Sequence, residues 1–155
     1  MKNKILLGLI ILSVFLIFGC TRIGQGSTPR DSSGSIDLNA CLAKSFCTGT
    51  SAIVRMGCKV DCYSKKALET KQPETCNPLK DDPDTGISAY TVCLQDLGKD
   101  VRSAEPCKRL SQYPVQYNAC VSNIARKIRD STLCSSIVEA PGYLGEKESC
   151  ARPLD

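Results

Sequence analysis

Cysteine is the residue type with the most varied chemistry in this chain. Eleven of the 155 residues are cysteines, and there is no histidine. Cysteines can form disulfides, ligate metals as thiolates or act as nucleophiles. Without histidine, the chain cannot use Ser-His or Cys-His activation of a nucleophile, nor the usual histidine metal ligands. The spacing of the cysteines from one another therefore carries most of the information.

The cysteines mark a 15-residue window that occurs three times. Every copy begins and ends with cysteine, and the tenth position is always basic, as Lys71, Arg102 and Arg129. The copies are Cys62 to Cys76, Cys93 to Cys107 and Cys120 to Cys134. A period of this kind indicates a repeat protein, with one supersecondary unit per copy.

Apolar periodicity predicts that the repeated units are helical. From Tyr90, apolar residues recur at i+3, i+4, i+7 and i+11, and the same offsets recur from Tyr117; this is the pattern of one helix face. We predict long helices over Ser51 to Lys71, Ser88 to Arg102 and Val115 to Arg129, and a short one over Ile36 to Phe46. Ile53 and Val54 are assigned to the apolar side of the first long helix.

Shorter helical pieces are predicted between the long helices, beginning at Cys76, Cys107 and Cys134. Each has an aliphatic residue one helical turn later, and each ends at a proline. Strand signals are weak throughout. The sequence therefore predicts an all-α fold of disulfide-stapled repeats, each a short helix, a loop and a long helix.

Helix geometry favours one pairing of the cysteines. A helix of 14 residues separates its ends by about 20 Å, whereas a disulfide needs Cα atoms within about 7 Å. Bonding inside the window is therefore disfavoured, and bonding across the loops is predicted. The predicted pairs are Cys76–Cys93, Cys107–Cys120 and Cys134–Cys150.

Four further cysteines allow two pairings. Nested bonds in a helical hairpin would join Cys41 to Cys62 and Cys47 to Cys58, whereas the repeat logic suggests Cys47–Cys62 with Cys41–Cys58. The nested pairing is preferred. Five bridges closing such loops would each contribute roughly 3 kcal/mol. Such staples suit a chain with only three Phe and no Trp.

The N-terminus has the composition of an export leader. Met1 to Lys4 is basic, Ile5 to Phe18 is almost continuously apolar, and Gly19-Cys20 follows. The apolar run is short for a permanent span, which needs about 20 residues. The alternative to cleavage is an uncleaved signal anchor.

The segment Ile17-Phe18-Gly19-Cys20 resembles the lipobox of prokaryotic lipoproteins. The resemblance covers the first 20 residues and departs from the usual form at Ile17 and Phe18. It implies that residues 1–19 are removed and that Cys20 carries the lipid. Residues 20–35, which are rich in Gly and Ser, would be a flexible tether, and residues 36–155 the cysteine-rich α-helical repeat domain.

Other site chemistries are disfavoured by spacing or charge. The arrangement of Cys41, Cys47, Cys58 and Cys62 does not match common zinc sites, and no C-x-x-C redox motif occurs. The acids at Asp81, Asp82 and Asp84 lack the spacing of a calcium loop and suit a polar turn. No cofactor is predicted. Without Lys2 and Lys4 the chain has 18 basic and 16 acidic residues, net +2, too little for nucleic-acid binding.

These patterns lead to a functional class. We expect an exported lipoprotein on the extracytoplasmic face of a membrane, attached to lipid through Cys20 and not an enzyme. Its role would be binding or structural at the cell surface, with an envelope protein as a possible partner. The alternative is a carboxylate-dependent extracytoplasmic hydrolase, in which two acids converge at about 5 to 10 Å. The acid-rich region from Pro73 to Pro106 would supply them, with Asp84 and Asp96 as candidates.

Overall fold

The protein is a stack of helices with one repeated connection. The structure, a computed structural model, describes residues 28–139 and 145–152. Regular structure in these ranges is helical, apart from an isolated bridge between Arg30 and Ile36. The predicted all-α class is therefore confirmed. The predicted leader and Cys20 lie outside the described residues.

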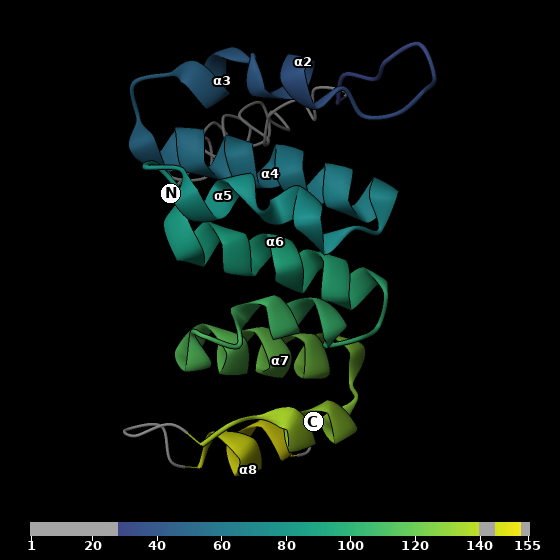
Figure 1. The fold of residues 1–155 in the computed structure, drawn as a ribbon, viewed down its shortest axis with the longest axis vertical. Helices are drawn as coiled ribbons and strands as arrows, with labels where there is room; N and C mark the ends of the chain where they lie inside the picture. The colour runs from purple at the N-terminus through teal and green to yellow at the C-terminus, as the bar shows by residue number, and fades with distance from the viewer. Residues whose placement is uncertain (1–27, 140–144, 153–155) are drawn as a thin grey trace, which may run out of the picture.

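Three long helices lie side by side and form the body of the stack (Figure 1). They are α4 (Ala52–Thr70), α6 (Gly86–Asp100) and α7 (Pro114–Ile128). Each begins and ends within two residues of its predicted range. The chain returns between them through short segments, so that all three run in the same direction and end at one edge of the stack (Figure 1).

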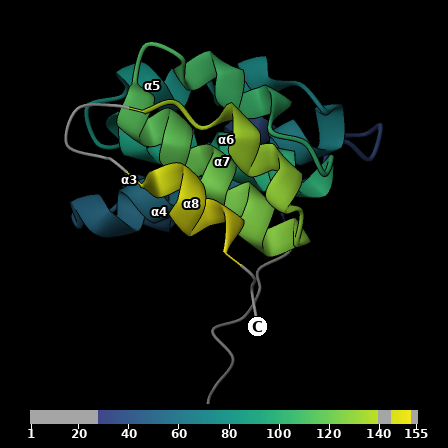
Figure 2. The same ribbon diagram turned by 90° about the horizontal axis from the view of Figure 1, so that it is seen from below.

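The short segments that follow the long helices are short 3-10 helices, labelled η, and short α-helices. Proline stands at the first turn of several of them, where a missing N–H costs nothing. Figure 2, a view from below, shows them layered against the long helices. Between the long helices they are η1 (Pro73–Cys76), α5 (Pro78–Asp81) and η2 (Glu105–Leu110); η3 (Ser131–Ser136) and α8 (Glu146–Ala151) follow α7.

The five disulfides of the structure join the pairs that the sequence favours, including the nested pairs. Four of them are equivalent, each linking a short segment to the next long helix or to α8. Their Cα atoms are 5.9, 5.9, 5.8 and 5.7 Å apart for Cys41–Cys62, Cys76–Cys93, Cys107–Cys120 and Cys134–Cys150. The fifth, Cys47–Cys58, is additional to the repeat.

The core consists of aliphatic side chains and disulfides. The units built on α6 and α7 each contribute a buried leucine from the short segment that precedes the long helix and further aliphatic residues from the long helix itself. Burial of each such side chain contributes on the order of 1.5–3 kcal/mol. The fully buried aliphatic residues are Leu79, Leu94, Leu97, Leu110, Val121 and Ile124.

The prediction of one helix over Ile36 to Phe46 is wrong. The segment forms two helices, α2 (Leu38–Leu42) and α3 (Ser45–Thr48). Asp37 caps α2 by accepting a hydrogen bond from the Ala40 N–H. Lys44 then takes an extended conformation that separates the two helices. The chain thus gains a corner that turns α3 back toward α4.

The assignment of Ile53 and Val54 to a buried side is also wrong. Ile53 is 78% exposed and Val54 is 50% exposed. The reason is the length of α4, which begins ten residues before Cys62, whereas α6 begins seven before Cys93 and α7 six before Cys120. The first turn of α4 therefore projects beyond the starts of its neighbours.

The described part of the predicted tether is folded. Residues 29–36 fold into a loop in which the Ile36 N–H and Ser35 hydroxyl donate to the Glu69 carboxylate at 3.0 and 2.8 Å. The hydrogen bond from Ile36 is the main cause that lowers the pKa of Glu69 below its usual value. This loop is thereby attached near the C-terminal end of α4.

Candidate functional site

The candidate site is a groove at the edge where the long helices end. It has a volume of about 390 Å³ and lies among the ends of α4 and α6 and the segments that follow them. Leu97, Val101 and Pro106 supply apolar lining, and Lys71, Glu105, Lys108 and Arg109 supply charge. This combination suits a binding groove more than a structural void.

The position of the groove follows from how each long helix ends. Lys71, Arg102 and Arg129 have φ angles of 57°, 51° and 56°. They adopt the left-handed conformation that commonly ends a helix, usually with glycine. These are the three residues of the basic column at position ten. The sequence placed them in the last helical turn, whereas the structure places them just past it.

Two of these basic residues reach the end of the next long helix. The Lys71 ammonium pairs with the Asp100 carboxylate, at the last residue of α6. The Arg102 guanidinium donates to the Ile128 carbonyl, at the last residue of α7, at 3.5 Å. Exposed carbonyls at a helix C-terminus favour cations. The basic column thus connects neighbouring units along this edge.

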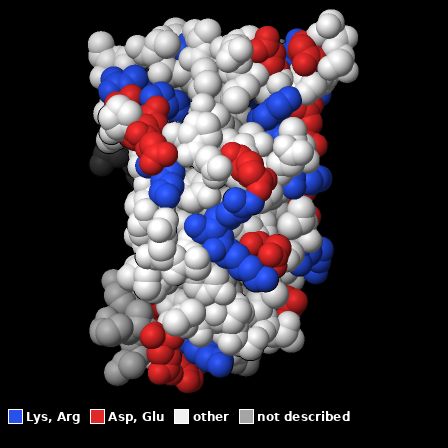
Figure 3. All heavy atoms as spheres, viewed as in Figure 1, with Lys and Arg blue, Asp and Glu red and all other residues white. Residues whose placement is uncertain are grey.

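The groove carries three ion pairs that remain open to solvent. Lys71 pairs with Asp100, Arg109 with Glu74, and Lys108 with Glu105 at 2.6 Å. The hydrogen bond to Glu105 raises the pKa of Lys108 above its usual value. Figure 3 shows basic and acidic side chains interleaved on this face of the stack. Such exposed pairs contribute little to stability, so a charged ligand could exchange with them.

A close approach of two helices fixes the floor of the groove. A Cβ on Gly98 would lie 2.3 Å from Ile124 Cδ1 and 2.8 Å from the Ser103 carbonyl oxygen. Leu97, the neighbour of Gly98, is 1% exposed. Val101, one turn further on, is 39% exposed. Leu97 therefore anchors the floor, while Val101 presents apolar surface in the groove.

The sequence did not identify this groove. Lys108 and Arg109 have no recurring counterparts that would single them out, and Val101 recurs only as part of the predicted apolar helix face. The proximity of these residues depends on the return of η2 across the end of α6. The only sequence signal was the basic column, which includes Lys71. That signal indicated a helix end, and it did not indicate a ligand site.

The acids of the predicted polar turn form an ion-pair network, which we call the latch. It comprises Arg55 and Lys59 of α4 with Asp82 and Asp84. The distances are 2.6 Å for Arg55–Asp84, 2.6 Å for Lys59–Asp82 and 3.0 Å for Lys59–Asp84. The hydrogen bond from Arg55 is the main cause that holds the pKa of Asp84 well below its usual range.

The candidate acids of a hydrolase have different surroundings. Asp84 lies in the latch, and Asp96 pairs with Lys99 at 3.2 Å on the same helix. A general acid needs a raised pKa. The cations around Asp84 lower its pKa instead, so Asp84 is suited to hold its two cationic partners and not to donate a proton.

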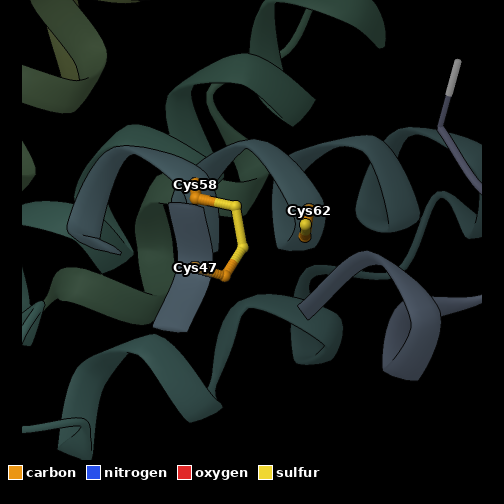
Figure 4. Close-up of side chains that lie close together, drawn as sticks. All are labelled: Cys47, Cys58 and Cys62. Carbon is orange, nitrogen blue, oxygen red and sulfur yellow. A yellow bond between two sulfur atoms is a disulfide. The ribbon is translucent and has the colours of Figure 1, made fainter. Parts of the chain in front are cut away.

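Three cysteine sulfurs lie close enough together to suggest a metal site. The sulfurs of Cys47, Cys58 and Cys62 are all within 4.8 Å of one another (Figure 4). Cys47 is bonded to Cys58, and Cys62 is bonded to Cys41. Metal ligation requires thiolates. In this disulfide state the cluster joins two staples and offers no thiolate.

Comparisons with protein-family models, with curated proteins and with solved structures find no match to this chain. Among the described helices, none combines the length and the apolar character that crossing a bilayer requires.

Proposed function

We propose that this protein is an exported lipoprotein, held at the extracytoplasmic face of a membrane through Cys20, whose repeat domain binds an envelope protein. Its role is binding or structural and not catalytic. The observation that carries the binding role is the open groove with an apolar floor and three exchangeable ion pairs. The lipid attachment rests on the lipobox-like leader.

The proposed ligand of the groove is a protein segment with an apolar side chain flanked by charges. Val101 and Pro106 would contact the apolar side chain. The ligand's charges would replace one member of an exposed pair, such as Glu105 on Lys108, whose side chains are both 68% exposed. Exchange of one ion pair for another costs less than desolvation of an unpaired charge.

A site-specific photo-crosslinker tests the binding role. We would place it at Val101 in the groove and, as a matched control, at Val115, because the two valines are 39% and 37% exposed. Irradiation of intact cells should give a discrete protein adduct from position 101 and none from position 115. Equal adducts from both positions, or none from position 101, would contradict a groove that binds protein.

The intact mass of the unreduced protein from the membrane fraction tests the anchoring. We expect a chain that starts at Cys20, heavier by a lipid and lighter by ten hydrogens for the five disulfides. A chain that starts at Met1 without lipid would instead be a signal anchor.

A binding role is favoured over a hydrolase because both candidate acids are already paired with cations.

A further inference from the structure

The segment from α3 to the first turn of α4, which we call the apolar hairpin, carries three of the seven large exposed apolar residues of the described chain. Phe46, Ile53 and Val54 are 53%, 78% and 50% exposed. The other large exposed apolar residues of the described chain are valines spread over α6, α7 and the segments that follow them. Exposed apolar residues that cluster in one element indicate an interaction site more strongly than scattered ones do.

The apolar hairpin is rigid. The Cys47–Cys58 disulfide joins α3 to α4, with Cα atoms 5.1 Å apart. The Arg55 guanidinium donates to the Gly49 and Thr50 carbonyls at 2.8 and 2.9 Å, and to Asp84 of the latch. Val54 stands one turn before Cys58 in α4 and Phe46 precedes Cys47 in α3, so the staple holds together the two helices that carry them.

Core packing does not account for this construction. Among the described residues, the other units connect the short segment to the long helix without a second disulfide. The only phenylalanine among the described residues, Phe46, points its ring largely into solvent. A disulfide that holds apolar side chains outward lowers the entropy lost when they bind something.

The charges around the apolar hairpin indicate what it contacts. From Leu38 to Val60 the chain contains no acidic residue. Of the bases in this range, Arg55 and Lys59 pair with Asp82 and Asp84 of the latch. A surface with exposed apolar side chains and with its neighbouring charges paired to one another suits the interface of a bilayer.

The attachment point brings the same end of the stack to the membrane. The loop attached to Glu69, together with α2 and α3, forms the outermost layer at one end (Figure 1). Thr28 is eight positions after Cys20, and eight residues span at most about 28 Å. The apolar hairpin lies at the far end of α4, 16 residues or about 24 Å from Glu69. A bilayer that holds Cys20 is therefore within reach of the apolar hairpin.

We infer that Phe46, Ile53 and Val54 insert into the lipid surface as a second membrane contact beside the lipid anchor. This inference rests on the proposed anchoring through Cys20. One anchor leaves the stack free to tilt, and a second contact at the other end of α4 fixes α4 along the membrane. The remaining units then project away from the membrane and carry the groove with them.

Tryptophan fluorescence tests this contact, because the chain contains no tryptophan. We would compare Phe46→Trp with Val138→Trp, since both native side chains are 53% exposed and Val138 lies near the opposite end of the stack. Ile53→Trp is a second probe of the apolar hairpin in case Phe46→Trp disturbs its fold. The lipid-carrying full chain would be reconstituted into vesicles of neutral and anionic phospholipids with brominated acyl chains.

The inference predicts a shift of emission to shorter wavelength and quenching by brominated lipid at positions 46 and 53, with neither at 138. Protein that sediments with the vesicles but is not quenched at 46 and 53 would overturn the contact and leave the anchor intact. A blue shift without quenching would also overturn it and indicate burial against protein, either within the chain or against a second copy of it. Failure to sediment would overturn both the anchor and the contact.

Discussion

The stack of α4, α6 and α7 and the apolar hairpin at its end use the same staple for different purposes. In the stack, each disulfide lies inside the main core, and Cys76, Cys93, Cys107 and Cys120 are fully buried. In the outer layer, Cys41, Cys47 and Cys62 form a separate small cluster with Leu38 and Leu42. The stack therefore combines burial with cross-links, whereas the apolar hairpin depends mainly on its cross-links.

The difference shows that a disulfide can hold the conformation of a segment that has few buried side chains. Where side chains pack well, a staple adds to stability that the unit already has. Where they point into solvent, as Phe46 and Ile53 do, the staple holds a conformation that burial could not hold. Variants that remove staples, close contacts or ion pairs in each region should therefore affect the two regions differently.

The largest effect is expected from removing a disulfide of the stack. The double variants Cys107→Ala with Cys120→Ala, and Cys47→Ala with Cys58→Ala, open loops of 13 and 11 residues. Loop closure predicts a loss of roughly 3 kcal/mol for each. The stack variant also leaves cavities in the core, which we expect to add about 1–2 kcal/mol. Urea unfolding monitored by circular dichroism measures both losses.

Amide hydrogen exchange separates the two variants further. Loss of Cys47–Cys58 should speed exchange in residues 43–55 and leave α6 and α7 protected, because the apolar hairpin opens as a local unit. Loss of Cys107–Cys120 should speed exchange throughout α6 and α7. Equal losses of stability with uniform exchange would mean that the two regions unfold together, which contradicts the comparison.

A glycine at a close helix contact in the stack and a glycine of α4 just beyond the apolar hairpin give the second contrast. Gly98→Ala should destabilise the stack by about 1–3 kcal/mol through overpacking, because the new methyl would overlap Ile124 and the Ser103 carbonyl. Gly57→Ala, in α4, meets no atom within 4 Å. It should stabilise by about 0.5–1 kcal/mol through helix propensity. Denaturant midpoints of the two variants should thus move in opposite directions from that of the wild type.

Most of the fold could be predicted from the sequence through the periodicity of its apolar residues and cysteines. The repeated apolar offsets from Tyr90 and Tyr117 located α6 and α7, since a helix must place its buried residues on one face. The constant spacing inside the windows and the variable spacing outside them led to the disulfide pairs found in the structure. Both inferences use only helix geometry and the short reach of a disulfide.

Features that depend on tertiary contacts could not be predicted from the sequence. Ile53 and Val54 fit the helical pattern, but nothing in the sequence shows that no neighbouring helix covers the first turn of α4. The capture of residues 29–36 by Glu69 joins segments more than 30 positions apart. The groove, likewise, exists only because η2 returns across the end of α6.

The latch connects the two regions, and its removal should have a smaller effect. In Asp84→Asn the ion pairs to Arg55 and Lys59 are lost, so the apolar hairpin should exchange faster and the chain should be less stable at pH 7. The folded state lowers the pKa of Asp84. The stabilisation is therefore present above the unfolded pKa of about 3.9 and is lost as the pH falls toward the folded pKa.

Urea unfolding over a series of pH values checks this dependence. The stability difference between wild type and Asp84→Asn should be constant near neutral pH and should narrow below about pH 4. Asp61→Asn is the control, because Asp61 forms a more exposed pair with Lys65 on the same helix. A difference for Asp84→Asn that persists unchanged into acid would show that the ionised carboxylate does not hold the latch.

The smallest effect concerns the basic column at the helix ends. Arg129 and Lys71 both adopt the left-handed conformation, which costs an L-residue about 1–2 kcal/mol and glycine almost nothing. Replacement by glycine removes this cost, but part of the stabilisation is offset by the greater conformational freedom of glycine in the unfolded chain. In the described ranges the Arg129 guanidinium makes no hydrogen bond or ion pair, so Arg129→Gly should stabilise by about 0.5–1 kcal/mol.

Lys71→Gly should stabilise the protein less than Arg129→Gly does. It also removes the exposed ion pair with Asp100, which is worth about 0.2–1 kcal/mol. Denaturant midpoints of the two variants measure the difference directly, and high salt should shrink it by screening the Lys71 pair. If Arg129→Gly proves the more destabilising of the two, the Arg129 side chain must contact something beyond the described residues. In that case the column would continue past α7, and the edge of the stack would be a surface on which a further helix end can dock.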